Sequence, residues 1–132
     1  MALIKPEDCL KLDIPEIDSQ HETLIRRINL LHEAMLQRAD KPALSGLLSR
    51  LLEQTQNHFA YEEELMFQYN YPGYEAHKSE HHRLMQHLLD LNERYERGDL
   101  LLSFAIALEL KGWAVGHIEK SDKPLGNFLN NQ

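Results

Sequence analysis

The chain has a single cysteine, Cys9, among its 132 residues, so no disulfide bond can form within it. Disulfides are common in secreted domains and rare in reducing compartments. The first 20 residues are interrupted by charges and prolines and lack the apolar core of a secretory signal peptide. These two absences predict a cytoplasmic protein.

Positive charge is also scarce, because 14 Lys and Arg residues face 21 Asp and Glu residues, for a formal net charge of −7. Nucleic acids and anionic membranes attract basic surfaces, so we expect neither as a partner. The most apolar run, residues 100–110, is far shorter than the roughly 18 residues that indicate a membrane span. The sequence therefore predicts a soluble protein.

Sustained strand alternation and internal repeats are missing too, and apolar residues instead recur at helical spacing. After an irregular arm to about residue 17, Ser19 followed by Glu22 resembles a capping box, and Asp18 would cap almost as well. A second helix is expected to begin at Asp40, with Pro42 in its first turn, and to run to the break at residues 69–74.

Two further helices complete the predicted fold. The third runs from about residue 75 to 97, with Gly98 as its C′ residue. The fourth is expected to be capped by Asp99 and to end near residue 119, because Pro124 cannot lie inside it. Short connections make neighbouring helices antiparallel, so the fold class is all-α, an up-down-up-down four-helix bundle with an irregular N-terminal arm.

Histidine, by contrast, is abundant, with eight residues. His58 precedes Glu62 by four residues in the second predicted helix, and His77 precedes His81 by four in the third. Residues four apart in an α-helix lie about 40° apart around the axis and about 6 Å apart along it, so their side chains project together. Each pair is spaced to supply two ligands to metal ions inside the bundle.

The other two helices offer further ligands. His117 and Asp122 are five residues apart, which in an unbroken α-helix would turn them about 140° from each other. Pro124 requires the helix to loosen near Ser121, so we expect Asp122 to swing back beside His117. With His21 from the first helix, the candidates are five imidazoles and two carboxylates: His21, His58, Glu62, His77, His81, His117 and Asp122.

This donor set narrows the choice of metal. Imidazole suits iron, copper, zinc and nickel, while calcium and magnesium prefer oxygen ligands. A zinc site normally takes four ligands, and seven are too many for one ion. Two ions bridged by Glu62 and Asp122 would use all seven ligands, and a pair of iron ions is the most economical interpretation.

Four fragments of the chain resemble the hemerythrin family, in particular its single-domain bacterial members. They are IDSQH (17–21), HFAYEEELM (58–66), YPGYEAHKSEHHRL (71–84) and WAVGHIEKSDKPL (113–125). They span nearly the whole chain in the family's order. The resemblance implies one hemerythrin-like domain over residues 1–132 that folds as a four-helix bundle.

The resemblance also implies a cofactor and a function. It implies two iron ions (Fe2+/Fe3+) with an oxo or hydroxo bridge that bind molecular oxygen reversibly, and no enzyme activity. Matched residue by residue, one iron would be ligated by His77, His81 and His117. The other would be ligated by His21 and His58, beside an open position for oxygen. Glu62 and Asp122 would bridge the two irons.

The family's oxygen pocket is walled by apolar residues that exclude water. The matching residues here are Phe59, Trp113, Ala114 and Ile118. Members often carry a bulky aliphatic residue where this chain has Ala114, and a smaller side chain there would open a solvent route to the iron.

The remaining histidines, His32, His82 and His87, fit no ligand pattern, and we expect them at the surface or in contact with ligands. Glu63 is a candidate acceptor for the outer N–H of a ligand histidine, although with Glu64 it also fits a solvated helix face.

Three alternatives to an oxygen carrier stay open. They are a sensor of oxygen or redox state, a diiron enzyme that reduces nitric oxide or peroxide, and a metal-free helical scaffold. A delivery or sensing role would require a separate oxygen-using or signalling protein as partner. Five neutral imidazoles favour reversible binding over oxidation, because ferritin-like oxidases surround their metals mostly with carboxylates.

Overall fold

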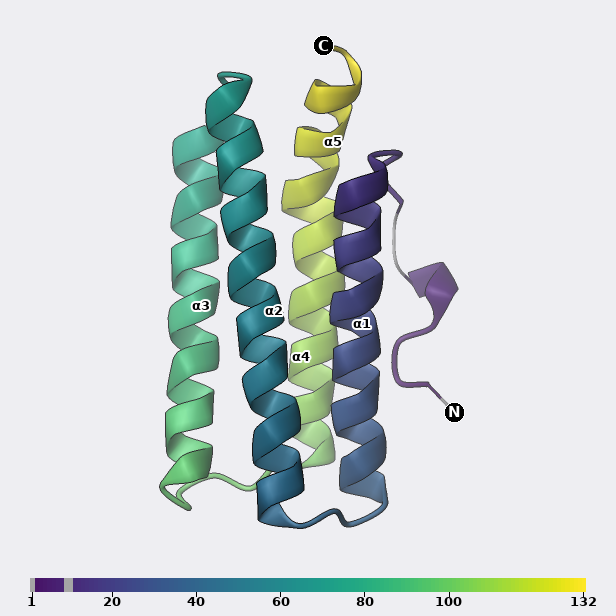
Figure 1. The fold of residues 1–132 in the computed structure, drawn as a ribbon, viewed down its shortest axis with the longest axis vertical. Coiled ribbons are helices and arrows are strands. Elements are labelled where there is room, and N and C mark those ends of the chain that lie inside the picture. The colour runs from purple at the N-terminus through teal and green to yellow at the C-terminus, as the bar shows by residue number, and fades with distance from the viewer. Residues whose placement is uncertain (1, 9–10) are drawn as a thin grey trace.

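Four long helices run side by side along the long axis of the molecule in the computed structural model, which describes residues 2–8 and 11–132 (Figure 1). Neighbouring helices are antiparallel and joined by short loops, and none of the described residues forms a strand. The all-α up-down-up-down bundle is therefore confirmed. In chain order the elements are η1 (Pro6–Asp8), α1 (Pro15–Leu36), α2 (Lys41–Gln68), α3 (Tyr74–Glu96), α4 (Phe104–His117), η2 (Ile118–Asp122) and α5 (Lys123–Asn130).

The first helix begins earlier than the capping-box pattern predicts, at Pro15 instead of Ser19. Proline suits this position because the first N–H groups of a helix have no intrahelical partner. The Asp18 carboxylate instead accepts hydrogen bonds from the backbone N–H groups of Leu12 (2.9 Å) and Asp13 (3.1 Å). Asp18 thus ties the N-terminal arm to α1.

The start of α2 and the end of α3 lie where the sequence predicts them. The Asp40 side chain caps α2 by accepting from the backbone N–H of Ala43 at 3.0 Å. Gly98 follows α3 with φ +82°, in the left-handed region where glycine carries no Cβ penalty.

The predicted start of the last helix at Asp99 is wrong, because α4 begins at Phe104 and is capped by Ser103, which accepts from the N–H of Ile106 at 3.5 Å. Asp99 stays in the preceding turn, where its carboxylate pairs with the Arg97 guanidinium at 3.3 Å. Residues 99–103 are needed to cross from α3 to α4 at the end of the bundle (Figure 1).

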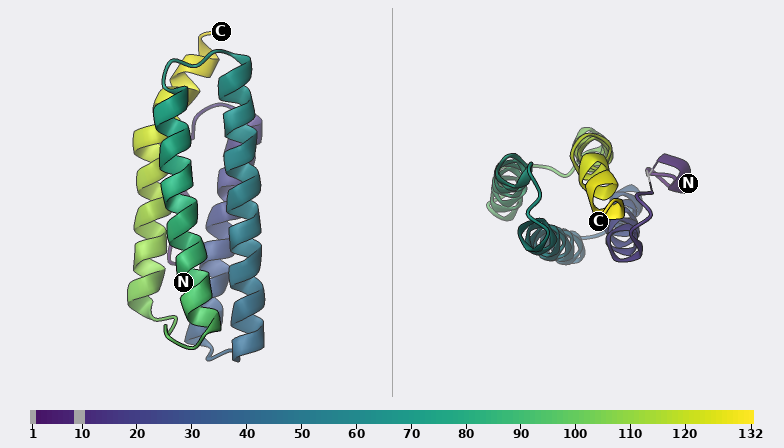
Figure 2. Two further views of the ribbon diagram at one scale, coloured as in Figure 1. Left: turned by 90° about the vertical axis from the view of Figure 1, so that its left-hand side faces the viewer. Right: turned by 90° about the horizontal axis from the view of Figure 1, so that it is seen from above.

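The N-terminal arm lies outside the bundle, beside α1 (Figure 2). Ile4 is 1% exposed, and Asn29 of α1 both donates to its carbonyl (2.9 Å) and accepts from its N–H (2.8 Å). Asp8 pairs with Lys111 of α4 at 3.6 Å. The arm therefore contacts both α1 and α4. Cys9 lies outside the described residues.

The interior of the bundle has two parts. Toward the α1–α2 and α3–α4 loops it is apolar, and the fully buried side chains there include Ile28, Leu31, Leu48, Leu51 and Leu88. Toward the other end, buried histidines and carboxylates lie among apolar side chains such as Ile17, Met66 and Leu125. Among the described residues, no helix is long and apolar enough to cross a membrane.

Candidate metal centre

The one-turn spacing on α2 and α3 places four ligand candidates inside the bundle. His58 and Glu62 are 1% and 0% exposed, and His77 and His81 are 5% and 1% exposed. His58 Nε2 and His81 Nε2 both lie 3.0 Å from the Glu62 carboxylate, and His77 Nε2 lies 3.3 Å from it. Three histidines from two helices thus surround one carboxylate.

The π-helical segment η2 brings His117 and Asp122, which are five residues apart, together. In a π-helix the hydrogen bond joins residues five apart, so His117 and Asp122 stack on one side of the chain. Their Nε2 and Oδ1 atoms are 3.2 Å apart. The predicted loosening near Ser121 is confirmed, since that residue lies within η2.

The helical chain does not stop near residue 119, however, and that prediction is wrong. Helical backbone continues through η2 into α5, with Pro124 in the first turn of α5. The N–H of Lys123 still bonds to the carbonyl of Ile118, five residues back. The N–H that Pro124 lacks therefore falls where the backbone changes from π to α, a position that tolerates its loss.

His21 completes the set from α1. Its Nε2 lies 3.0 Å from Asp122 Oδ2 and 3.7 Å from Glu62 Oε2. The candidate ligands form two groups, and within each group the ligand atoms all lie within 4.8 Å of one another. Glu62 and Asp122 belong to both. The groups are Glu62, His77, His81, His117 and Asp122, and His21, His58, Glu62 and Asp122.

Most of the ligand atoms lie close together without hydrogen-bonding to one another. The Nε2 atoms of His58, His77, His81 and His117 are buried without a hydrogen-bond partner, although carboxylate oxygens lie 3.0 to 3.3 Å away. Both oxygens of Glu62 are also without a partner. An unsatisfied buried polar group costs about 1 to 3 kcal/mol, so this many in one place fit a site built for metal ions.

In the metal-free site, the histidines and the carboxylates shift one another's pKa values. Burial lowers the pKa of His21, but the hydrogen bond to Asp122 and the negative charges of Asp122 and Glu62 outweigh it and raise that pKa to about 9. Burial likewise lowers the pKa of His77, but the nearby carboxylates of Asp122 and Glu62 outweigh it and raise that pKa to about 9. Burial raises the pKa values of Glu62 and Asp122, yet the surrounding histidines bring both below the usual range. Metal ions would displace the protons that these histidines hold.

An outer layer of acceptors orients three of the histidines. His58 Nδ1 contacts Gln20 Oε1 at 2.6 Å, and His81 Nδ1 contacts Glu63 Oε2 at 3.0 Å. An acceptor at Nδ1 places the ring proton there and leaves Nε2 free as a ligand. The interpretation of Glu63 as such an acceptor is confirmed.

Glu80 plays the same role for His117, although no pattern in the sequence predicted it. Its carboxylate accepts from His117 Nδ1 at 2.7 Å and from the Ser121 hydroxyl at 2.5 Å. Gln20 was also missed, although it directly precedes His21 in the IDSQH fragment. Glu80 joins α3 to the π-helical segment, so only the packing of the two helices reveals it.

The predicted pocket residues lie around the same region. Phe59 stacks on the His81 ring with centroids 3.8 Å apart, and it meets the Trp113 indole edge-on at 6.4 Å. Ala114 and Ile118 are each 1% exposed. The structure thus places Phe59 directly against a ligand candidate, with Trp113 behind it.

The other three histidines differ from one another. His82 is exposed, and His87 is bonded to Glu109 at 2.6 Å on the surface. His32 is neither at the surface nor in contact with a ligand, so its prediction is wrong. It is buried against Phe104, and both its ring nitrogens lack partners.

Comparison with known proteins decides the family. The model of the hemerythrin HHE cation binding domain matches residues 12–129. The chain belongs to the hemerythrin family. The resemblance that the four fragments indicated is therefore confirmed.

Named relatives and solved structures agree with this membership. Bacteriohemerythrin of Stenotrophomonas maltophilia is 34% identical over 125 residues, covering 93% of this chain and 79% of that protein. Its counterpart in Pseudomonas paraeruginosa is 32% identical over 126 residues, covering 92% and 78%. The crystal structure of a wild-type hemerythrin superposes with a TM-score of 0.88 at 27% identity, covering 96% of this chain and 97% of that one. A leucine-to-alanine hemerythrin variant gives a TM-score of 0.89 at 28% identity, with the same coverage.

Proposed function

We propose that this member of the hemerythrin family holds two iron ions and binds molecular oxygen reversibly, to store, carry or deliver it, without acting as an enzyme. The observation that carries the proposal is the sharing of two buried carboxylates, Glu62 and Asp122, by two groups of histidines. Five imidazoles and bridging carboxylates are donors that iron accepts. When bound, the iron pair would supply electrons to oxygen on binding and take them back on release.

The ligand roles follow from the two groups. His77, His81 and His117 would hold one ion, and His21 and His58 the other, with Glu62 and Asp122 between them. The second ion would be held by one imidazole fewer, which would leave room for oxygen beside it. These assignments explain why four buried Nε2 atoms lack a hydrogen-bond partner.

The outer acceptors differ between the two groups. His81 and His117 each face a carboxylate, Glu63 and Glu80, whereas His58 faces the neutral amide of Gln20. A carboxylate acceptor raises the basicity of its imidazole more than an amide does. The ion held by three histidines would therefore have two of the more basic ligands, and the ion proposed to bind oxygen would have a less basic one in His58, which would favour release.

Water must be kept from bound oxygen if the protein is to release it unchanged. Phe59, which is 3% exposed, covers the ring of His81, and the Trp113 ring lies against Phe59. Ala114 and Ile118 add buried apolar surface on α4 and η2. We propose that these four residues wall the oxygen pocket.

Oxygen release under vacuum tests the function. The protein is reduced without oxygen, exposed to air and then evacuated, and its visible spectrum is recorded at each step. We expect an absorption band that appears with air and disappears under vacuum over repeated cycles. A band that decays irreversibly, or steady consumption of nitric oxide or peroxide, would instead favour an enzyme.

A further inference from the structure

The hydroxyl of Ser121 forms a hydrogen bond to a residue of another helix. Ser121 lies in η2, and its Oγ atom donates to Glu80 Oε2 of α3 at 2.5 Å. The hydroxyls of Thr23 and Thr55 instead bond to the backbone carbonyl four residues earlier, as serine and threonine commonly do in helices. The Ser121 hydroxyl therefore serves a contact between helices rather than the turn in which it lies.

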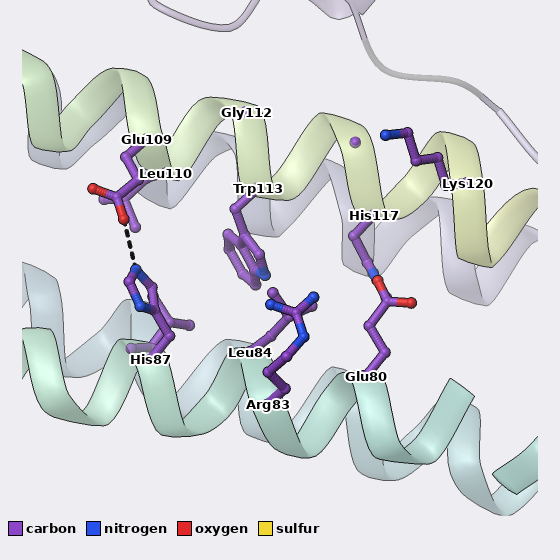
Figure 3. A pocket seen from close by; sticks show the side chains of 12 residues that line it. Glu80, Arg83, Leu84, His87, Glu109, Leu110, Gly112, Trp113, His117 and Lys120 are labelled. Atoms are coloured by element: carbon purple, nitrogen blue, oxygen red, sulfur yellow. Dashed lines mark hydrogen bonds and ion pairs between the residues drawn. The ribbon is translucent and has the colours of Figure 1, made fainter. Parts of the chain in front are cut away.

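The carboxylate of Glu80 accepts one hydrogen bond on each oxygen. Its Oε1 atom accepts from His117 Nδ1 at 2.7 Å, and its Oε2 atom accepts from Ser121. Arg83 and Lys120 lie near it in the groove between α3 and α4, but among the described residues neither pairs with it. Figure 3 shows the Glu80 carboxylate against the His117 ring, between the two helices. One carboxylate thus joins α3 to two residues that are one turn apart.

The Glu80 side chain depends on both contacts to stay in place. It is 29% exposed, so water competes for its carboxylate. Ordering a long side chain such as glutamate costs rotamer entropy, which a single hydrogen bond at a partly exposed site offsets poorly. With Ser121 bonded to one oxygen, the other oxygen stays directed at His117.

The same contact lies directly beside a second ligand candidate, Asp122. In an unbroken α-helix Asp122 would lie about 140° around the axis from His117, so the π-helical turn has to be maintained. The bond from Ser121 to Glu80 ties this turn to α3. His77, also on α3, has its Nε2 atom 3.0 Å from Asp122 Oδ1. The bond therefore fixes the residue next to Asp122 relative to the helix that Asp122 faces.

We propose that Ser121 is a positioning residue of the metal centre. Its hydroxyl holds the Glu80 carboxylate, which in turn holds the His117 ring with Nε2 toward the metal site. The same bond keeps Asp122 beside His117. Ser121 acts only through Glu80 and contacts no metal ion itself. This inference rests on the metal binding in the proposed function, but not on the binding of oxygen.

The ring proton of His117 tests the first step in the metal-free protein. Nitrogen-15 NMR identifies the Nδ1–H group, and its exchange with water at constant pH reports how firmly Glu80 accepts it. We expect Ser121→Ala to accelerate this exchange about tenfold, the effect of losing one hydrogen bond. Ser79→Ala is the matched control, because it removes the same hydroxyl from an exposed residue next to Glu80, and it should change nothing.

Metal affinity tests the consequence for the site. Cobalt(II) is the probe, because its visible absorption reports its ligands, and competition with a chelator gives its affinity. We expect Ser121→Ala to lower that affinity about tenfold, at the low end of the effect of removing an outer hydrogen-bond partner of a metal ligand. Ser79→Ala should bind cobalt as the native chain does.

A double variant distinguishes positioning through Glu80 from a general loss of structure. In a Glu80→Ala background, Ser121→Ala should have no further effect on cobalt affinity, because the two residues belong to one hydrogen-bond chain. A tenfold loss in both backgrounds would overturn the proposal, and so would native exchange of the His117 proton in Ser121→Ala. A native chain that binds neither cobalt nor iron would overturn the metal centre itself, whereas the proton exchange would still show whether Ser121 holds Glu80.

Discussion

His117 Nε2 lies 3.2 Å from Asp122 Oδ1, although the two residues are five apart in a helical stretch. The π-helical segment η2 makes this contact possible, because its hydrogen bonds join residues five apart. π-Helical turns inside α-helices are often found at functional sites. Here the turn places Asp122 opposite Glu62 of α2, and these two carboxylates are the ligands that the two groups share.

Removing one shared carboxylate should remove metal. In Glu62→Ala, the remaining ligands would face the charge of two buried ions with one bridging carboxylate missing. We expect the iron content, measured by elemental analysis, to fall from two per chain to one or fewer. Glu64→Ala is the matched control, because Glu64 is exposed on the same helix. Two irons per chain in both variants would refute the role of Glu62 as a bridge.

The outer acceptors should set the reduction potential. Gln20→Glu places a carboxylate opposite His58 Nδ1, which lies 2.6 Å from the amide in the native chain. A more basic ligand favours the ferric state, so the midpoint potential should fall and autoxidation should accelerate. Spectroelectrochemical titration measures the first effect. Glu33→Gln, an exposed change of opposite sign on α1, serves as a control, and a potential in Gln20→Glu that stays constant or rises is the contrary result.

Filling the small position in the pocket wall should protect bound oxygen. Ala114 is 1% exposed, and Ala114→Leu adds apolar volume beside the proposed oxygen pocket. We expect slower autoxidation of the oxygenated protein in stopped-flow experiments, together with a loss of about 1 to 3 kcal/mol in stability from overpacking. Ala105→Leu, at an exposed position of α4, should change neither. Equal or faster decay in Ala114→Leu would show that this position does not control access.

The metal-free protein should become less stable as the pH rises from about 6.5 to 9. The pKa of His21 and that of His77 rise from 6.5 to about 9 in the folded chain, so the folded state binds more protons than the unfolded state in this window. Their contribution to stability is complete below pH 6.5 and is lost as the pH passes 9. Thermal unfolding of the metal-free protein at a series of pH values measures it.

Iron binding should show the opposite dependence on pH. The ions would displace protons from His21 and His77, so the affinity for iron should increase up to about pH 9. Competition with a chelator across the same pH series provides the measurement. An affinity that is flat or falls with pH would mean that these two histidines do not bind as neutral ligands.

Much of the site was predictable because helical geometry connects spacing to direction. Residues four apart share a helix face, so His58 with Glu62 and His77 with His81 could be paired from sequence alone. Pro124 indicated where the last helix must depart from α geometry. The inference failed in one respect, because the helical chain continues past that proline into α5 instead of ending.

The features that sequence reasoning missed depend on contacts between helices. Glu80 faces His117 only because α3 lies beside α4, and nothing in its local sequence separates it from a solvated glutamate. His32 of α1 is buried, with the ring of Phe104 from α4 at a centroid distance of 5.7 Å. The start of α4 was misplaced because Asp99 and Ser103 are both good caps, and the length of the crossing loop decides between them.

Anomalous X-ray diffraction from crystals of the iron-loaded protein, recorded on both sides of the iron absorption edge, tests the central claim most directly. We predict two iron peaks inside the bundle, each in contact with both Glu62 and Asp122, one beside His77, His81 and His117 and the other beside His21 and His58. A single peak, or two peaks that share neither carboxylate, would contradict this account of the metal centre.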